Sequence, residues 1–273
     1  MKTLQIHCDL GYQTQGPADF LFQIEAAHYP SSQTLVSETL SVDPALRAHS
    51  FTDANSGNRF FRLHKPLPGP LSIHYEATVQ VDVKPADENA RELPIHELPD
   101  ALLHYLMPSR YCESDVLART AYRTFGDQAP GYARVRAVTA WVNENVEYLV
   151  GSSNSMTTAR DVLVNRAGVC RDFAHLAIAF CRALNIPARL VVGYVKFAQP
   201  PQDFHAIFEA YLGGEWRLFD PTGLAPVDRL VRVGTGRDAK DVAFSTIFGA
   251  GAVVSMNPDI EEVQATAGAE VDA

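Results

Sequence analysis

Cys170 is the residue whose surroundings in this sequence most favour chemistry. It follows a glycine-bearing loop (165–169) and begins an apolar stretch that predicts a helix from about Cys170 to Leu184. The first turn of a helix presents unpaired backbone N–H groups and the positive end of the helix dipole, which together stabilise a thiolate. Arg171 adds a further positive charge. We therefore expect Cys170 to act as a nucleophile; the alternative is a core cysteine that happens to begin a helix.

A nucleophilic cysteine needs a base, and the nearest histidine along the chain is unsuitable. His175 lies five residues into the same predicted helix, which places it about 140° around the helix axis and about 7.5 Å along it from Cys170. Its side chain therefore cannot meet the thiol, and we expect His175 to be a hydrogen-bonded structural histidine. His205 is the better candidate, because it begins a predicted strand elsewhere in the chain.

A predicted hairpin brings His205 close to a carboxylate. The strand 205–212 is followed by two glycines, which signal a two-residue turn, and by a return strand that ends at Asp220. The register that such a turn imposes places His205 and Asp220 diagonally on one face, about 7 Å apart at the backbone. A carboxylate at that distance can orient an imidazole. Together with Cys170, the two residues form a candidate Cys-His-Asp set.

The other three cysteines, Cys8, Cys112 and Cys181, show no metal or redox signature. The sequence contains no Cys-x-x-Cys pair, so neither a zinc ribbon nor a thioredoxin-like motif is indicated. Cys181 lies about 16 Å along the predicted helix axis from Cys170, which is too far for a disulfide. We expect no metal and no cofactor, and we interpret these three cysteines as buried apolar side chains.

The segments around the candidate residues resemble the transglutaminase-like superfamily, and specifically bacterial members described as candidate cysteine proteases. The first 83 residues also look like the β-rich domain that accompanies these bacterial proteins. The resemblance implies an α+β fold, with an N-terminal antiparallel β-sandwich-like domain followed by a papain-like, transglutaminase-like α+β catalytic core. It rests on five segments: Tyr105–Asp115, Arg166–His175, Pro187–Tyr194, His205-Ala206 and Trp216–Thr222.

The resemblance also implies an activity, which is acyl transfer at an amide carbonyl. In this scheme Cys170 is the nucleophile, His205 is the general base and acid, and Asp220 orients the imidazole. The substrate is a peptide or protein amide, and a thioester is the intermediate. A cysteine peptidase or amidase, a hydrolase of the thiol protease type, is the leading interpretation. The alternatives are an amine acyltransferase, either a transglutaminase or an N-acetyltransferase-like enzyme, and an inactive scaffold or binding module that keeps the fold.

The oxyanion that forms in such a reaction needs hydrogen-bond donors. The backbone N–H of Cys170 is the natural first donor. The sequence leaves the second donor open. Trp141 falls inside a predicted helix, and Tyr148 and Asn154 are weaker candidates.

The candidate residues depend on two regions with different periodicity. Strands predominate over residues 1–83, and apolar residues alternate strictly along Leu71–Val83, the period of a half-buried strand. The polar, proline-bearing stretch 84–97 is predicted to be a linker, and residues 98–250 the catalytic domain. Residues 251–273 show little periodicity, and we expect them to form a partly disordered C-terminal extension.

Individual elements follow from the same patterns. The first two predicted strands are Thr3–Tyr12 and Phe20–Ala26, separated by the turn residues Gly16-Pro17. After about residue 97 the period becomes helical. The chain is then predicted to form helices at 114–125, 130–148, 158–168 and 170–184, followed by strands at 188–195, 205–212 and 216–220.

Composition narrows the class of protein. The 273 residues are 47% hydrophobic and 20% charged, which is ordinary for a soluble globular protein long enough to bury a core without disulfides. The formal net charge of −9 argues against a nucleic-acid partner held by phosphate contacts. No run approaches the ~20 apolar residues of a membrane span, and no signal peptide is evident, so we expect a cytoplasmic protein without membrane contact. The sequence does not indicate the oligomeric state.

Overall fold

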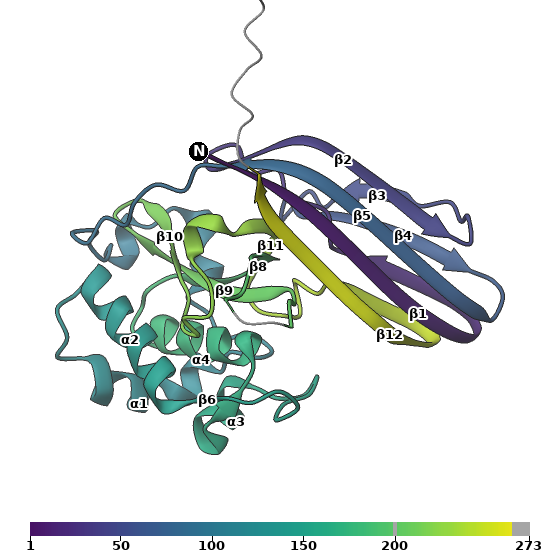
Figure 1. The fold of residues 1–273 in the computed structure, drawn as a ribbon. Coiled ribbons are helices and arrows are strands. Elements are labelled where there is room, and N and C mark those ends of the chain that lie inside the picture. The colour runs from purple at the N-terminus through teal and green to yellow at the C-terminus, as the bar shows by residue number, and fades with distance from the viewer. Residues whose placement is uncertain (199–200, 264–273) are drawn as a thin grey trace, which may run out of the picture.

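The N-terminal part of the described chain contributes five strands to an antiparallel sheet, and a sixth strand comes from its C-terminal end (Figure 1). The structure is a computed structural model and describes residues 1–198 and 201–263. The bounds are β1 Lys2–Phe22, β2 Gln33–Asp43, β3 His49–Thr52, β4 Arg59–Lys65, β5 Gly69–Val81 and β12 Ser245–Val263. The strand order is β2-β5-β1-β4-β3, and β12 also pairs with β1.

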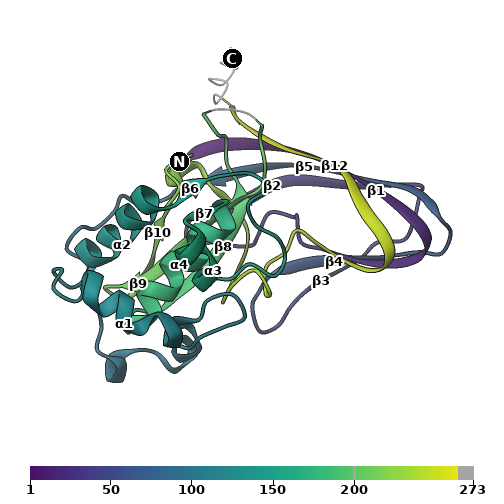
Figure 2. The same cartoon turned by 90° about the horizontal axis from the view of Figure 1, so that it is seen from below.

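Strand β1 is continuous where the sequence predicted two strands. The turn expected at Gly16-Pro17 does not form. Instead, the pairing with β12 is irregular between Gly11 and Tyr12 and between Thr14 and Ala18. β1 pairs with β5 as far as Thr14 and with β4 from Ala18 onward. Irregularities of this kind bend a strand and increase its twist, so the sheet curls (Figure 2).

Alternate side chains of the sheet are buried in its core. The alternation predicted from Leu71 onward is confirmed as far as Val81, whereas Val83 is half-buried. Four buried aromatic residues make ring-to-ring contacts on this face, with centroid distances of 4.8 Å between Phe22 and Phe61 and 5.3 Å between Tyr12 and Phe20. These large side chains remove much apolar surface from water and hold the two halves of the curl together.

The expectation for the C-terminal end of the chain is wrong for residues 251–263. These residues form most of β12, which pairs with β1 from Phe22 back to Thr3. Most of the strand is exposed, and only Pro258 and Ile260 are buried. Its sequence therefore lacks the apolar alternation that indicates a strand. Its stability comes mainly from backbone pairing. The rest of the predicted extension, residues 264–273, lies outside the described residues.

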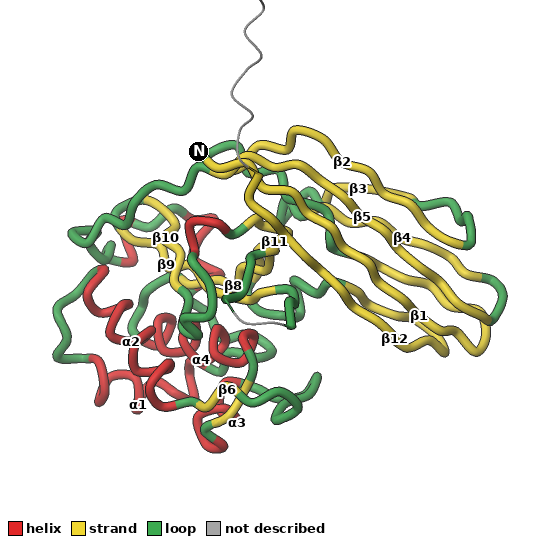
Figure 3. The backbone as a smooth tube through the Cα atoms, in the orientation of Figure 1, coloured by secondary structure: helices red, strands yellow, loops and turns green. Residues whose placement is uncertain are grey.

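The second part of the protein combines an antiparallel sheet with four α-helices that gather on one side of it (Figure 3). The sheet has the order β10-β9-β8-β11, and β6 pairs with β7 in parallel. The strands are β6 Glu147–Tyr148, β7 Ala167–Gly168, β8 Ala188–Tyr194, β9 His205–Leu212, β10 Glu215–Phe219 and β11 Val231–Gly236. The helices are α1 Ser114–Phe125, α2 Tyr132–Asn145, α3 Ala159–Asn165 and α4 Cys170–Ala183, with short 3₁₀ turns at Ile95–Glu97, Asp100–Tyr105 and Val227–Arg229.

Helix α4 is the central helix of this part. It packs against β8 and β9 on one side and against α1, α2 and α3 on the other. Nearly all of its residues from Asp172 to Arg182 are buried, as its apolar sequence predicted. A helix enclosed in this way holds its N-terminal residue in a fixed position relative to the sheet. Within the described ranges, no helix combines the length and the apolar character of a bilayer-spanning helix.

The two parts of the protein share one hydrophobic core, because buried side chains of the curled sheet and of α4 belong to the same cluster. The predicted linker is packed against the second part. Ala90 is buried, its carbonyl accepts a hydrogen bond from the backbone N–H of Tyr132 at 2.9 Å, and the Arg91 carbonyl accepts one from Gly213 at 2.8 Å. The domain boundaries at residues 83, 97 and 250 stay predictions.

The shared core predicts that a change in β12 destabilises the distant helices. Ile260 is 2% exposed, so Ile260→Ala should lower the free energy of unfolding by about 2–4 kcal/mol. Both tryptophans of the chain, Trp141 and Trp216, lie in the second part, and their fluorescence in a urea titration should report this loss.

The matched control is Val254→Ala on the same strand, where the side chain is exposed and the change should be within about 0.5 kcal/mol. If the tryptophan transition stays in place while the β-sheet circular dichroism signal shifts, the two parts unfold independently and the shared core does not couple them.

Candidate active site

Cys170 is the first residue of α4, as the sequence predicted, and its side chain is partly exposed. The turn before it is held by Asp172, whose Oδ2 accepts a hydrogen bond from the backbone N–H of Val169 at 2.9 Å. Asp172 is 1% exposed, and its other oxygen pairs with Arg171 at 3.0 Å. Asp172 therefore caps the helix and orders its first turn.

Gly168 allows the loop to approach α4 closely enough for this cap. A Cβ atom at position 168 would lie 2.7 Å from the Cβ of Asp172, closer than real carbon atoms approach one another. The loop that delivers Cys170 can follow its path only with glycine at this position.

His205 and Asp220 meet through the predicted hairpin. Glu215 pairs with Leu212 across two glycines that have positive φ angles, which is the register of a two-residue turn. His205 begins β9, and its Nε2 lies 2.9 Å from Oδ2 of Asp220. Both side chains are almost completely buried, so water does not compete for this hydrogen bond.

Thr222 and Asn143 hold Asp220 in place and did not emerge from sequence reasoning. The second carboxylate oxygen of Asp220 accepts hydrogen bonds from the backbone N–H of Thr222 at 2.8 Å and from its hydroxyl at 2.7 Å. Asn143 of α2 donates to the carbonyls of Pro221 and Thr222. A threonine two residues after an aspartate is a recognisable turn signal, whereas the Asn143 contact is long-range and leaves no local pattern.

The Cys170 thiol lies beside the other edge of the imidazole. Burial opposes the charged form of His205, but the hydrogen bond to Asp220 and the nearby Cys170 thiol outweigh burial and raise its pKa to about 9. Burial also opposes the charged form of Asp220, yet hydrogen bonds from His205 and Thr222 lower its pKa below the ordinary value. Nε2 is committed to Asp220, and the other ring nitrogen, Nδ1, is buried without a hydrogen-bond partner among the described residues.

Apolar side chains surround this pair. The ring of Phe197 meets the His205 ring edge-on, with centroids 5.1 Å apart, and Val195 and Leu230 line the small space next to His205 and Asp220. The Cys170 sulfur lies 3.9 Å from the Phe204 carbonyl oxygen. An apolar enclosure strengthens the electrostatic interactions inside it, because the local dielectric constant is low.

The structure separates the three candidates for a second oxyanion donor. Trp141 packs in the helical core against Phe125 and Phe180, and the Arg166 guanidinium lies 4.8 Å from the centre of its ring. The Asn154 side chain accepts a hydrogen bond from the backbone of Met156 and is used in its own turn.

Tyr148 lies next to Cys170. Strand β6 pairs in parallel with β7, which places Tyr148 opposite Gly168, two residues before the cysteine. Burial and the neighbouring Cys170 thiol raise the pKa of the Tyr148 hydroxyl, and a hydrogen bond from the Cys170 backbone opposes them. The parallel pairing joins segments about twenty residues apart through two-residue strands, too short to give a sequence signal.

The remaining cysteines and His175 have structural positions. His175 is fully buried, its Nε2 accepts a hydrogen bond from the Ala239 backbone at 3.1 Å, and burial lowers its pKa to about 4. Burial raises the pKa of the Cys8 and Cys112 thiols to about 12 and that of the Cys181 thiol still further. Among the residues described, no cluster of three or more His, Cys, Asp or Glu side chains has the arrangement of a metal site.

The shifted pKa of His205 predicts how stability depends on pH. Because the folded value of about 9 lies above the ordinary 6.5, the His205–Asp220 pair stabilises the fold fully below pH 6.5 and loses this contribution as the pH rises through 9. Asp220→Asn should therefore lower the free energy of unfolding most at pH 6, by up to about 3 kcal/mol. In urea titrations its difference from the native protein should shrink toward pH 9.5.

The control for this pH dependence is Asp19→Asn. Asp19 pairs with His64 at 2.8 Å, but both side chains are more than 60% exposed, so this change should give only a small difference at either pH. A cost of Asp220→Asn that is equal at pH 6 and pH 9.5 would contradict the raised pKa of His205.

Comparison with known proteins identifies the family to which this fold belongs. Residues 118–221 match the transglutaminase-like superfamily, and residues 1–101 match the bacterial transglutaminase N-terminal domain. A crystal structure described as "a Putative Cysteine Protease from Cytophaga hutchinsonii" is 42% identical, with a TM-score of 0.93, and the match covers 97% of this chain and 91% of that one.

Proteins of mycobacteria are also similar. An uncharacterized protein of Mycobacterium leprae is 29% identical over 262 residues, which covers 89% of this chain and 91% of that protein. An uncharacterized protein of Mycobacterium tuberculosis is 28% identical over 250 residues, which covers 77% and 75% of the two chains. With a curled β-sheet at its N-terminus and an α+β core behind it, the chain belongs to the transglutaminase-like superfamily.

Proposed function

We infer that this protein is a thiol-dependent enzyme that cleaves amide bonds through Cys170, His205 and Asp220. The observation that carries this proposal is the His205 imidazole, which is buried between the Asp220 carboxylate and the Cys170 thiol with its pKa raised to about 9. An imidazolium next to a thiol at a helix N-terminus favours the thiolate, which is the nucleophilic form. The similar Cytophaga protein, described as a candidate cysteine protease, supports the same class of substrate, a peptide or protein amide.

The reaction we propose has two halves. The Cys170 thiolate attacks the amide carbonyl carbon, and the carbonyl oxygen becomes an oxyanion. His205 passes its proton to the leaving nitrogen as the C–N bond breaks, so that an amine departs and a thioester remains on Cys170. His205 then takes a proton from water, which attacks the thioester and releases the carboxylic acid and the thiolate. Asp220 holds Nε2 of the ring throughout and stabilises its charged form.

Tyr148 is our candidate for the second oxyanion donor. Its hydroxyl lies beside Cys170, whose backbone N–H we assign as the first donor. The oxyanion would accept hydrogen bonds from that N–H and from the phenol O–H. The hydroxyl keeps its proton in this role because its pKa is raised.

Thiol reactivity tests the nucleophile. Iodoacetamide at pH 6 should label Cys170 first, because the other three cysteines are buried. His205→Gln should slow this labelling by at least about tenfold, since the positive partner of the thiolate is lost. Peptide mass mapping after short exposures gives the rates.

His64→Gln is the matched control, because His64 is exposed on the curled sheet and its loss should leave the labelling rate unchanged. If Cys170 reacts no faster at pH 6 than a free peptide thiol, the protein is an inactive scaffold of this fold. With an amide substrate in hand, mass spectrometry of the acyl group on Cys170, with water or an added primary amine as acceptor, separates hydrolysis from acyl transfer.

Replacement of Tyr148 tests the oxyanion donor. Tyr148→Phe should lower kcat by about 10²–10³, the effect of removing one oxyanion donor, and should change KM little. Iodoacetamide labelling of Cys170 should be retained, because alkylation forms no oxyanion. Tyr122→Phe, at an exposed position on α1, is the control and should leave kcat unchanged. A Tyr148→Phe enzyme with native kcat would assign the second donor elsewhere.

A further inference from the structure

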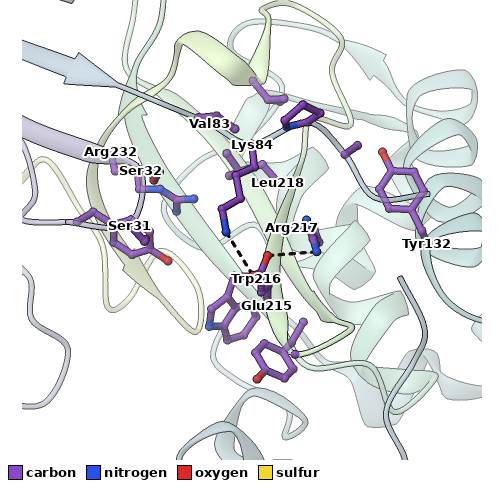
Figure 4. Close-up of a pocket in the computed structure, with 16 residues that line it drawn as sticks. Ser31, Ser32, Val83, Lys84, Tyr132, Glu215, Trp216, Arg217, Leu218 and Arg232 are labelled. Atoms are coloured by element: carbon purple, nitrogen blue, oxygen red, sulfur yellow. Dashed lines mark hydrogen bonds and ion pairs between the residues drawn. The ribbon is translucent and has the colours of Figure 1, made fainter. Parts of the chain in front are cut away.

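A cavity of about 290 Å³ lies where the curled sheet meets the catalytic sheet, away from Cys170 (Figure 4). Tyr211 of β9 and Trp216 and Leu218 of β10 form one wall, on the sheet face that also carries His205. Tyr211 lies six residues from His205, about 20 Å along the strand. The cavity is therefore separate from the candidate active site, and its volume is near the lower end for small-molecule sites.

One end of the cavity is polar, and buried ion pairs hold it in place. Arg232 is 5% exposed and lines it, and its Nη1 has no hydrogen-bond partner among residues 1–198 and 201–263. Its Nη2 pairs with Glu209, which is fully buried and also binds Arg189 at 2.8 Å. Two guanidinium groups thus share one carboxylate, which leaves an excess positive charge next to the cavity wall. A buried N–H without a partner is costly, so a ligand that accepts its hydrogen bond gains that free energy.

Two more cations reach the same cavity. Figure 4 shows Lys84 extended toward Glu215, which also pairs with Arg217. Arg217 lies opposite Ala210, so its side chain leaves the other face of β10 from Trp216 and Leu218 and contributes charge at the strand edge only. Counting the ion pairs around the cavity leaves a net charge of +1: Lys84, Arg189, Arg217 and Arg232 are opposed by Asp87, Glu209 and Glu215.

The other walls are aromatic and stiff. The Arg232 guanidinium stacks on Tyr29 at 4.3 Å, and Arg189 stacks on Trp216 at 4.1 Å. Tyr29 also accepts a hydrogen bond from Arg189 at 3.2 Å, so both rings are fixed by the buried ion cluster. Rigid aromatic walls beside hydrogen-bond donors suit a ligand that has a flat apolar body and a negative headgroup.

We propose that this cavity binds a small organic oxyanion, a carboxylate or phosphate carried on an aromatic or compact aliphatic body, with the headgroup on Arg232 and the apolar body against Trp216. The assignment goes beyond the proposed amide chemistry and uses none of its residues. Val227 lines both this cavity and the small space beside His205 and Asp220, so the two sites have a wall residue in common.

Calorimetric titration of the full-length protein tests the site. 3-Phenylpropionate and phenyl phosphate are the probes, and the tighter of the two identifies the headgroup. 3-Phenylpropanamide, which has the same ring without the charge, should bind at least about tenfold more weakly. The Cys170→Ala protein should bind both anions as the native protein does, so a failure of the catalytic proposal leaves this result unaffected.

Variants locate the binding. Arg232→Gln should weaken anion binding by about tenfold or more, whereas Arg119→Gln, at an exposed position on α1, should not change it. Should Arg232→Gln fail to fold, Trp216→Leu carries the test. In a Trp141→Phe protein, Trp216 is the remaining tryptophan, and its fluorescence should change as the anion saturates the site.

Three results would overturn the site. They are equal affinity for the amide and the acid, no saturable binding of either anion at millimolar concentration, and binding that Arg232→Gln and Trp216→Leu leave unchanged.

Discussion

The hydrogen bond between His205 and Asp220 is the constraint on which the second part of the protein depends. It holds a charged pair in an apolar environment, and such a pair is stable only when every partner is in place. The hairpin turn sets which residues face each other, and Thr222 satisfies the second oxygen of the carboxylate. Asn143 then connects that turn to helix α2. One buried contact thus fixes the sheet edge, the turn after it and a helix on the other side.

Cys170 reaches this pair through an independent route. Its helix is enclosed by three others and by the sheet, and its first turn is ordered by Asp172 inside the space that Gly168 leaves open. The thiol and the imidazole therefore come from elements whose positions are set by packing rather than by each other. Preorganisation of this kind allows a site to stabilise charge without reorganising when a substrate arrives.

Local patterns were sufficient for the parts of the structure that local chemistry specifies. The helix that begins at Cys170 and the register that joins His205 to Asp220 follow from a glycine loop, an apolar run and a two-glycine turn. Contacts between distant segments leave no local pattern in the sequence. Tyr148 reaches the cysteine through a pair of two-residue strands, and the cavity near Arg232 is assembled from five separate segments. The final strand was missed because backbone pairing, which is independent of side-chain type, holds it in the sheet.

The pairing of β1 with β12 joins the two ends of the described chain. Thr3 lies opposite Val263, so the strand made first on the ribosome acquires this neighbour only when nearly all of the chain has been made. Until then one edge of β1 presents unpaired N–H and C=O groups to other chains. Contacts of such long sequence separation form late and slowly. The same adjacency makes the ends suitable for joining by a short linker, so that a circularly permuted chain could begin inside a loop and form this pair early in synthesis.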